Sequence, residues 1–332
     1  MIKRAEQTSR ITDKKKMDIG NKKDWIMPGK MISMELSSYC DANCIFCPWG
    51  KDFSLKNKNM EFDLFKKCID EAVLHGVTVL DTSLMGNAFL DPGLEKKLSY
   101  CREQYPTLKI YFSSTCGTNM DFQFIAQYID TLHISMYGMT KKVYESIHRG
   151  GLKFEKVINN IEEILRLPKK ERPYIILTFL LLPENEHQME EWKSKWEGSA
   201  DEITIWKPHN WGGRYLQEPP SCEAYGHAKT CGRPFNDALC VWVNGDVSVC
   251  CISEDKKLVV GNIGEQTFEE IVFGERRKKI LEIHKKNDFY QCGLPCEKCD
   301  QIFDRSDALV YTSKNRALNA MIVSGDYIHN IK

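Results

Sequence analysis

The sequence predicts an α/β protein, with a partial (β/α)6 barrel of the TIM type followed by a small C-terminal α+β domain. Apolar runs typical of buried strands alternate with amphipathic helical segments up to about residue 208. Six such runs are present, fewer than the eight of a closed barrel. A different pattern follows a Gly- and Pro-rich stretch, so we expect a polar arm over 1–30, a core over 31–213 and a second domain over 214–332.

The six strand-like runs alternate with segments of helical periodicity, which predicts right-handed βαβ units and a parallel sheet. The runs cover 31–36, 77–84, 109–114, 131–137, 174–182 and 202–208. Three helices are predicted between them, over 62–76, 154–167 and 187–198; the first ends in Gly76 and the second precedes Pro168.

The C-terminal part begins with a linker-like stretch over 210–230 that is rich in Gly, Pro and polar residues. Two short strands, 238–243 and 246–250, follow with Asn244-Gly245 between them, the strongest short hairpin signal. A single helix is then expected over 267–286, ahead of a last group of cysteines.

Composition narrows the class of protein further. The chain has 332 residues, 42% of them hydrophobic, and no net charge, so nothing indicates a nucleic-acid partner. Its longest apolar run, 174–182, is far too short to cross a bilayer, and no apolar segment follows the basic N-terminus. We therefore expect a cytoplasmic protein that binds neither membrane nor nucleic acid.

Fourteen cysteines are many for such a chain. A disulfide framework is the alternative, but tight local spacing in a large chain without a secretory signal favours metal ligation. Cys40, Cys44 and Cys47 follow the first strand with C-x3-C-x2-C spacing. Three thiolates leave one iron of a four-iron cubane open for chemistry, because such clusters normally take four cysteines. The alternative is zinc with a fourth ligand, although zinc motifs usually show paired C-x2-C spacing.

The segment SYCDANCIFCPWG resembles the signature of the radical S-adenosylmethionine (SAM) superfamily, with Phe46 at the aromatic position before the last cysteine. The resemblance implies that Cys40, Cys44 and Cys47 are catalytic ligands of a 4Fe–4S cluster and that SAM chelates the open iron. An electron, delivered by a flavodoxin- or ferredoxin-type donor, then cleaves SAM to a 5′-deoxyadenosyl radical that abstracts a substrate hydrogen.

Further segments match regions where family members contact SAM. Gly86 and Asn87 follow the second strand, although family members often carry Glu-Pro after this glycine; we expect a contact from the backbone or from the Asn87 carbonyl. Ser114 in SSTCGTN and Ser135 in HISMYG end the third and fourth strands. Arg149 in YESIHRGG is predicted to pair with a carboxylate, or else to be a solvated charge at a helix end.

A second cysteine set resembles the SPASM/twitch extension of this superfamily. Cys231, Gly245 and Cys250 reproduce its C-x13-G-x4-C hallmark, and a C-x2-C pair, Cys296 and Cys299, follows. These four cysteines are expected to hold one auxiliary 4Fe–4S cluster, because no further cysteine follows for the two-cluster form. Three further cysteines compete as ligands of this cluster and leave the choice open: Cys292, Cys240 and Cys251. Cys222 is left without a predicted role, and three others are expected in the core: Cys68, Cys101 and Cys116.

The reaction is less constrained than the cofactors. The architecture is similar to that of the 2-deoxy-scyllo-inosamine dehydrogenases, which implies oxidation of a sugar, polyol or aminocyclitol alcohol, with the auxiliary cluster as electron acceptor. The alternatives are a peptide maturase or epimerase, or a non-catalytic iron–sulfur electron carrier. The segment that ends the last barrel strand supplies candidates for contact with a small-molecule or peptide substrate, namely Lys207, His209, Asn210 and Trp211.

Overall fold

The computed structural model describes residues 31–51, 53–215, 220–236, 239–253, 255–303 and 308–314. The arm predicted over 1–30 lies outside the described residues. Within these ranges, no helix is both long and apolar enough to cross a membrane.

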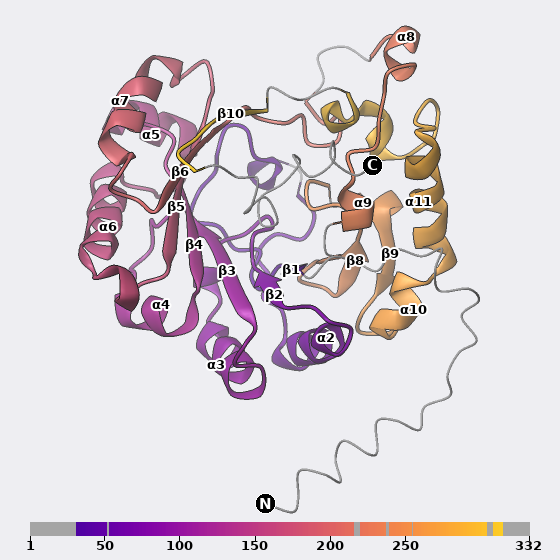
Figure 1. The fold of residues 1–332 in the computed structure, drawn as a ribbon, viewed down its shortest axis with the longest axis horizontal. Helices are drawn as coiled ribbons and strands as arrows, with labels where there is room; N and C mark the ends of the chain where they lie inside the picture. The colour runs from indigo at the N-terminus through magenta and orange to yellow at the C-terminus, as the bar shows by residue number, and fades with distance from the viewer. Residues whose placement is uncertain are drawn as a thin grey trace, which may run out of the picture.

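Six parallel strands form the wall of the partial barrel, which confirms the predicted fold class (Figure 1). They are adjacent in chain order: β1 (Met31–Met34), β2 (Val79–Asp81), β3 (Lys109–Ser114), β4 (Thr131–Ser135), β5 (Tyr174–Leu180) and β6 (Glu202–Trp206). Most are shorter than predicted at their carboxyl ends, because the chain leaves the sheet there to form the loops of the site.

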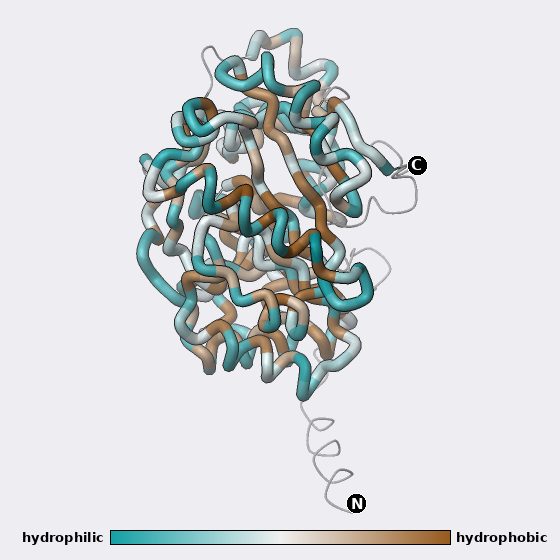
Figure 2. Tube along the Cα trace, turned by 90° about the vertical axis from the view of Figure 1, so that its left-hand side faces the viewer, coloured by the Kyte–Doolittle hydropathy of each residue, from teal (hydrophilic) through white to brown (hydrophobic). Residues whose placement is uncertain are grey.

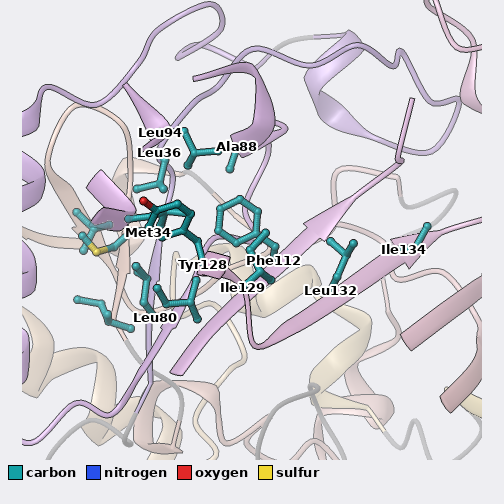
Figure 3. Packing of buried hydrophobic residues seen from close by; sticks show 14 of the residues in the cluster. Met34, Leu36, Leu80, Ala88, Leu94, Phe112, Tyr128, Ile129, Leu132 and Ile134 are labelled. Carbon is teal, nitrogen blue, oxygen red and sulfur yellow. The ribbon is translucent and has the colours of Figure 1, made fainter. Parts of the chain in front are cut away.

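Helices cover the outer face of the barrel (Figure 1). They are α2 (Phe62–Leu74), α3 (Leu94–Gln104), α4 (Phe122–Tyr128), α5 (Lys141–His148), α6 (Phe154–Arg166) and α7 (Met189–Trp196), with short 3-10 turns at η2 (Pro48–Gly50), η3 (Ala88–Leu90), η4 (Lys169–Glu171) and η5 (Glu186–Gln188). Alternate strand residues point outward into the core, where Leu36, Ala88 and Leu94 gather beside Phe112 (Figure 3). Hydrophilic residues occupy most outer turns of the chain, whereas hydrophobic residues concentrate inside (Figure 2).

The C-terminal part extends the same sheet at both edges. The predicted hairpin is present as β7 (Cys240–Val241) and β8 (Asp246–Ser248), followed by β9 (Val259–Asn262). Strand β7 pairs in parallel with β1, and β10 (Leu309–Thr312) pairs antiparallel with β6, giving a ten-stranded sheet. The remaining short elements here are α8 (Cys222–Tyr225), α9 (Arg233–Asn236), η6 (Lys256–Leu258), η7 (Pro295–Lys298) and η8 (Asp300–Ile302).

The single helix predicted over 267–286 is wrong. The structure has two helices, α10 (Phe268–Val272) and α11 (Glu275–Lys286). The chain breaks at Gly274, whose dihedral angles are extended, with φ −67° and ψ 148°. Glycine is about 1 kcal/mol poorer than alanine in a helix, and here it lets α11 start in a new direction.

Candidate active site and auxiliary cluster site

Cys40, Cys44 and Cys47 lie on the loop that follows β1, and this loop is attached to the end of α5. The Asn43 amide donates to the His148 carbonyl at 2.9 Å, and the Ile45 amide donates to the Ile147 carbonyl at 3.0 Å. The Gly151 amide donates to the Asp41 carbonyl at 3.1 Å. These backbone hydrogen bonds fix the path of the loop. The positions of the three thiols are therefore set by the backbone of the loop.

The surroundings of the thiols on this loop disfavour their ionised form, so a thiolate there needs a positively charged partner. Burial, together with the neighbouring charges of Asp41 and Cys47, raises the pKa of Cys40 to about 12. The pKa of Cys44 is raised well above its usual value by burial and then by Cys47 and Cys40. Because the three sulfurs repel one another as anions, they suit the ligation of a metal centre, which removes the protons.

A buried polar cluster joins this loop to the loops after β2 and β3. The Asn87 side chain is 2% exposed and donates from Nδ2 to Asp41 Oδ1 at 3.1 Å. Its Oδ1 accepts from the Phe89 amide at 3.3 Å and from Ser114 Oγ at 3.4 Å. Both lone pairs of the Asn87 amide oxygen are therefore used inside the protein. The contact with SAM expected of this segment, from the backbone or from the Asn87 carbonyl, stays a prediction.

Gly86 explains why this segment approaches the cysteine loop so closely. A Cβ at Gly86 would lie 1.9 Å from the Ser37 carbonyl oxygen, so no larger residue fits. The next amide, that of Asn87, donates to the Tyr39 carbonyl at 2.7 Å. Gly86 and Asn87 thus bring the end of β2 against the residues just before Cys40.

An aromatic group lies beside Cys44. Phe46 packs against Tyr137 with ring centroids 5.5 Å apart, and the Tyr137 hydroxyl donates to Ser135 Oγ at 2.9 Å. Tyr137 also stacks on His148 at 4.8 Å. His148 is fully buried, its Nδ1 lies 3.4 Å from Cys44 Sγ, and burial lowers its pKa to about 3. Sequence reasoning brought Phe46 and Ser135 to this place but missed His148, although it lies next to Arg149 in the same motif.

Arg149 itself is exposed at the carboxyl end of α5. Its Nε donates to the Ser146 carbonyl at 3.4 Å, as expected for a cation at a helix end. The carboxylate contact predicted for Arg149 stays a prediction.

The second cysteine set converges on one cavity. The four expected ligands line it, together with the buried Arg233: Cys231, Cys250, Cys296 and Cys299. Burial raises the pKa of Cys299 to about 12, with Cys231 as a further cause. The pKa of Cys296 is raised well above its usual value by burial and then by Cys231, Cys250 and Cys299. Their mutual influence shows that the four sulfurs face the same space.

The competing cysteines do not line this cavity in the described part of the chain. Cys240 is buried in β7, where it pairs with Ser33 of β1, and Cys222 is exposed on α8. Cys251 neighbours Cys250, and Cys292 is half-buried on a separate turn. Cys68, Cys101 and Cys116 are buried in the main core, as predicted. No disulfide joins any of these cysteines in the described part of the chain.

A second buried histidine contacts one of the four cysteines that line this cavity. His284, on the last turn of α11, has no exposed surface, and its Nε2 is 3.5 Å from Cys296 Sγ. Its Nδ1 is 2.8 Å from Thr230 Oγ1. Burial lowers the pKa of His284 to about 4, so the ring is neutral near neutral pH. The sequence offered no signal for this residue.

Zinc bonded to sulfur at about 2.3 Å in a tetrahedron needs its sulfurs roughly 3.8 Å apart. Among the residues that the structure describes, no three His, Cys, Asp or Glu side chains converge closely enough for one ion.

The inner face of the barrel is polar. Strand alternation turns Ser33, Asp81, His133, Thr178 and Thr204 away from the apolar outer layer. Ser33 Oγ donates to Asp81 Oδ2 at 2.9 Å, His133 Nε2 is hydrogen-bonded to Thr178 Oγ1, and Thr178 Oγ1 lies 2.7 Å from Thr204 Oγ1. TIM barrels usually fill this space with Val, Ile and Leu, so the interior here is built for polar contents.

The segment after β6 is placed between the two cysteine sites. Asn210 Nδ2 donates to the Lys298 carbonyl at 2.8 Å, and its Oδ1 accepts from the Asp300 amide at 3.1 Å, so this side chain holds the loop of Cys296 and Cys299. Trp211 packs on a cluster formed by Phe53, Met85 and Trp242.

The other two candidates of this segment differ in exposure. Lys207 is exposed, and His209 Nδ1 accepts from the Trp211 amide at 3.2 Å. Substrate contact by these residues stays a prediction.

The partial barrel carries three cysteines on one loop, and a cavity lined by four more cysteines follows in the C-terminal part. This combination is typical of a class of iron–sulfur enzymes. The family model of the radical SAM superfamily matches residues 34–194, and that of SPASM, an iron–sulfur cluster-binding domain, matches residues 231–300. The chain belongs to the radical SAM superfamily and carries a SPASM domain. It is therefore a radical SAM enzyme with a 4Fe–4S cluster, SAM and an auxiliary cluster as cofactors.

Solved structures with low sequence identity share the fold. BtrN in complex with AdoMet and 2-DOIA has a TM-score of 0.60 at 17% identity, over 82% of this chain and 93% of that one. Streptococcus suis SuiB bound to precursor peptide SuiA has a TM-score of 0.59 at 12% identity, over 75% and 66%. The structure anSMEcpe with bound AdoMet has a TM-score of 0.54 at 17% identity, over 85% and 93%. No curated protein matches the chain in sequence.

Proposed function

We propose that this enzyme oxidises an alcohol carbon of a sugar, polyol or aminocyclitol to a carbonyl. The observation that carries the proposal is the polar inner face of the barrel, where Ser33 and Asp81 lie on one side and His133, Thr178 and Thr204 on the other. A substrate with several hydroxyl groups can exchange hydrogen bonds with such a wall, whereas an apolar side chain would leave buried polar groups unsatisfied.

The two cysteine sets fit the two redox steps of this reaction. In the proposal Cys40, Cys44 and Cys47 hold the cluster that binds SAM, and Cys231, Cys250, Cys296 and Cys299 hold the auxiliary cluster. When bound, these groups would supply a hydrogen-atom acceptor derived from SAM and a one-electron acceptor in the SPASM domain. The substrate loses one hydrogen atom from carbon, one proton from its hydroxyl and one electron, and the carbon–oxygen single bond becomes double.

The chain's own residues have three tasks in this scheme. The bonds from Asn43, Ile45 and Gly151 hold the cysteine loop still while SAM binds. The apolar cluster of Phe53, Met85 and Trp242 packs against Cys47 and keeps water from the space between the two sites. The inner wall of the barrel, with Asp81 and His133, receives the hydroxyl groups of the substrate.

The first test is anaerobic reconstitution with iron and sulfide, followed by dithionite, SAM and a panel of polyols and aminocyclitols. We expect 5′-deoxyadenosine in each active mixture and, with the true substrate, a product lighter by two hydrogen atoms that reacts as a carbonyl. A variant with alanine at Cys231, Cys250, Cys296 and Cys299 should still cleave SAM but give no carbonyl. Carbonyl formation by that variant would contradict the role of the auxiliary site.

Iron counts test the architecture independently of the substrate. Two four-iron cubanes give about eight irons per chain, and replacing Cys40, Cys44 and Cys47 together by alanine should leave about four. An unchanged count would show that these cysteines are not ligands.

Peptide modification is the second candidate, because SuiB, captured with its precursor peptide, matches the fold about as well as BtrN, captured with 2-DOIA. A maturase would join atoms within a peptide, and an epimerase run in deuterated water would place one non-exchangeable deuterium in its product. Neither outcome accompanies alcohol oxidation, so mass spectrometry of the products separates the three reactions.

A further inference from the structure

We propose that His284, oriented by Thr230, donates an N–H···S hydrogen bond to Cys296 and thereby raises the reduction potential of the auxiliary cluster. The inference rests on the proposed function in one respect, that Cys296 is a ligand of this cluster. It adds a residue that makes the site a better electron acceptor, which the proposed oxidation requires.

The position of His284 is fixed by its surroundings. The imidazole is fully buried, with Phe289 edge-on at 5.0 Å and Phe235 edge-on at 6.3 Å. Only its two nitrogens reach polar atoms, Nε2 toward Cys296 Sγ at 3.5 Å and Nδ1 toward Thr230 Oγ1 at 2.8 Å. In this dry environment each contact has to satisfy one ring nitrogen.

Thr230 is held in place from two sides. Its backbone amide donates to Asn287 Oδ1 at 2.7 Å, which ties it to the residue that ends α11. Its Oγ1 accepts from the Gly232 amide at 3.0 Å, one residue from Cys231. The hydroxyl therefore spends one lone pair on Gly232 and still has its own proton to give.

The sulfur decides which tautomer the ring adopts. A cysteine bound to iron is a thiolate, which accepts hydrogen bonds but has no proton to donate. Nε2 of His284 must then carry the proton, because a bare nitrogen would set its lone pair against the sulfur. Nδ1 is left as an acceptor, and the Thr230 hydroxyl donates to it, so a chain of donors runs from Gly232 through Thr230 and His284 to Cys296.

The direction of the effect follows from charge. Reduction adds one negative charge to the cluster and its sulfurs, and an N–H dipole aimed at a ligand sulfur stabilises that charge. The guanidinium of Arg233, buried in the wall of the same cavity, acts in the same sense. At the first site, His148 contacts Cys44 through Nδ1, but its Nε2 has no hydrogen-bond partner among the described residues, so no second residue orients that ring as Thr230 orients His284.

The test is a redox titration followed by electron paramagnetic resonance, on the full chain in which Cys40, Cys44 and Cys47 are alanine so that only the auxiliary cluster contributes. His284→Phe keeps the aromatic packing and removes both nitrogens. We expect the ratio of reduced to oxidised cluster at a given potential to fall about tenfold, a shift of about 59 mV for one electron. Thr230→Val should shift the potential in the same direction by less, and Thr230→Ser, which keeps the hydroxyl, should not shift it.

The outcomes separate the two levels of the argument. A reconstituted background variant without iron would refute the auxiliary site and this inference with it. Full iron content with an unshifted or raised potential in His284→Phe and Thr230→Val would refute the hydrogen bond and leave the proposed oxidation standing. If His284→Phe fails to retain iron, the pair Thr230→Val and Thr230→Ser decides, because neither changes a group that touches the cluster. A strong 15N coupling typical of a direct iron–nitrogen bond would also overturn the inference.

Discussion

Gly150 is a residue on which the position of the cysteine loop depends. It follows α5 with φ +66°, and a Cβ placed on it would lie 2.7 Å from the Asp41 carbonyl oxygen and 3.0 Å from Ala42 Cα. Both atoms are backbone of the loop that carries Cys40 and Cys44, so no side chain can rotate away. Gly151, the next residue, meets nothing within 4 Å.

The expected cost of Gly150→Ala has two parts. A non-glycine residue held at positive φ costs about 1–2 kcal/mol, and the close contact has to be relieved by moving one backbone segment away from the other. We expect a total on the order of 3 kcal/mol, which corresponds to roughly a hundredfold shift toward a displaced loop. Gly151→Ala keeps the hydrogen bond from its backbone amide to the Asp41 carbonyl, and we expect it to destabilise the loop little.

The assay compares the two alanine variants after identical anaerobic reconstitution. Gly150→Ala should lose most of the iron of the first site and most SAM cleavage while keeping the auxiliary cluster, which is read from its spectrum. Gly151→Ala should match the wild type in both. Wild-type iron content and SAM cleavage in Gly150→Ala would refute the reasoning that this turn positions the loop.

Two further changes test buried polar contacts. Asn87→Asp keeps the shape of the side chain and its acceptor roles toward Phe89 and Ser114, but it places a second carboxylate where Nδ2 now lies 3.1 Å from Asp41 Oδ1. We expect the free energy of unfolding to fall by about 2 kcal/mol and the melting temperature to drop. An unchanged melting temperature would contradict the contact. Asp201 is partly desolvated, yet the hydrogen bonds that it accepts from Arg172 and the Ile175 amide lower its pKa. Its ionised form therefore stabilises the fold above about pH 4, and this stabilisation is lost as the pH falls through the lowered pKa. Asp201→Asn in the metal-free chain should therefore be destabilised by about 3 kcal/mol at pH 7 and progressively less toward pH 3, whereas a gap that grows on acidification would contradict this sign.

The order of the barrel strands could be read from the sequence because each strand lies in a mostly apolar run. Helical periodicity predicted α2, α6 and α7, whereas α3, α4 and α5 were not predicted. The ends of the strands could not be read from the sequence. The run over 77–84 gives a strand only over Val79–Asp81, and the bond from the Thr82 amide to the Tyr111 carbonyl ends its pairing with β3 before the chain enters the site. Local pattern records the preference for a strand, whereas the loops after it are shaped by long-range contacts.

The candidate site shows the same division. The resemblance to the SPASM extension indicated Cys231, Cys250, Cys296 and Cys299 but left Cys292 open, because Cys292 repeats the C-x3-C-x2-C spacing with Cys296 and Cys299. The cavity is lined by the first four and not by Cys292.

The two histidines beside the sulfurs could not be predicted from the sequence, for a different reason. His148 is separated from Cys44 by 104 positions, and His284 contacts Cys296 across the turn after α11. A lone histidine in an amphipathic helix carries no local mark of such a contact.

The pairing of β7 with β1 links the two sites mechanically. Ser33 and Met34 of β1 are in register with Cys240 and Val241 of β7, so the strand that leads into the Cys40 loop also carries the hairpin that leads to Cys250. The Val241 carbonyl accepts from the Glu35 amide at 2.9 Å, and Glu35 Oε2 accepts from the Val243 amide at 3.2 Å. Because a one-residue slip would reverse the facing of every side chain in β7, the register is fixed by burial on both faces. A change that loosens this pairing should therefore disturb both clusters together, in contrast to Gly150→Ala, which should affect the first alone.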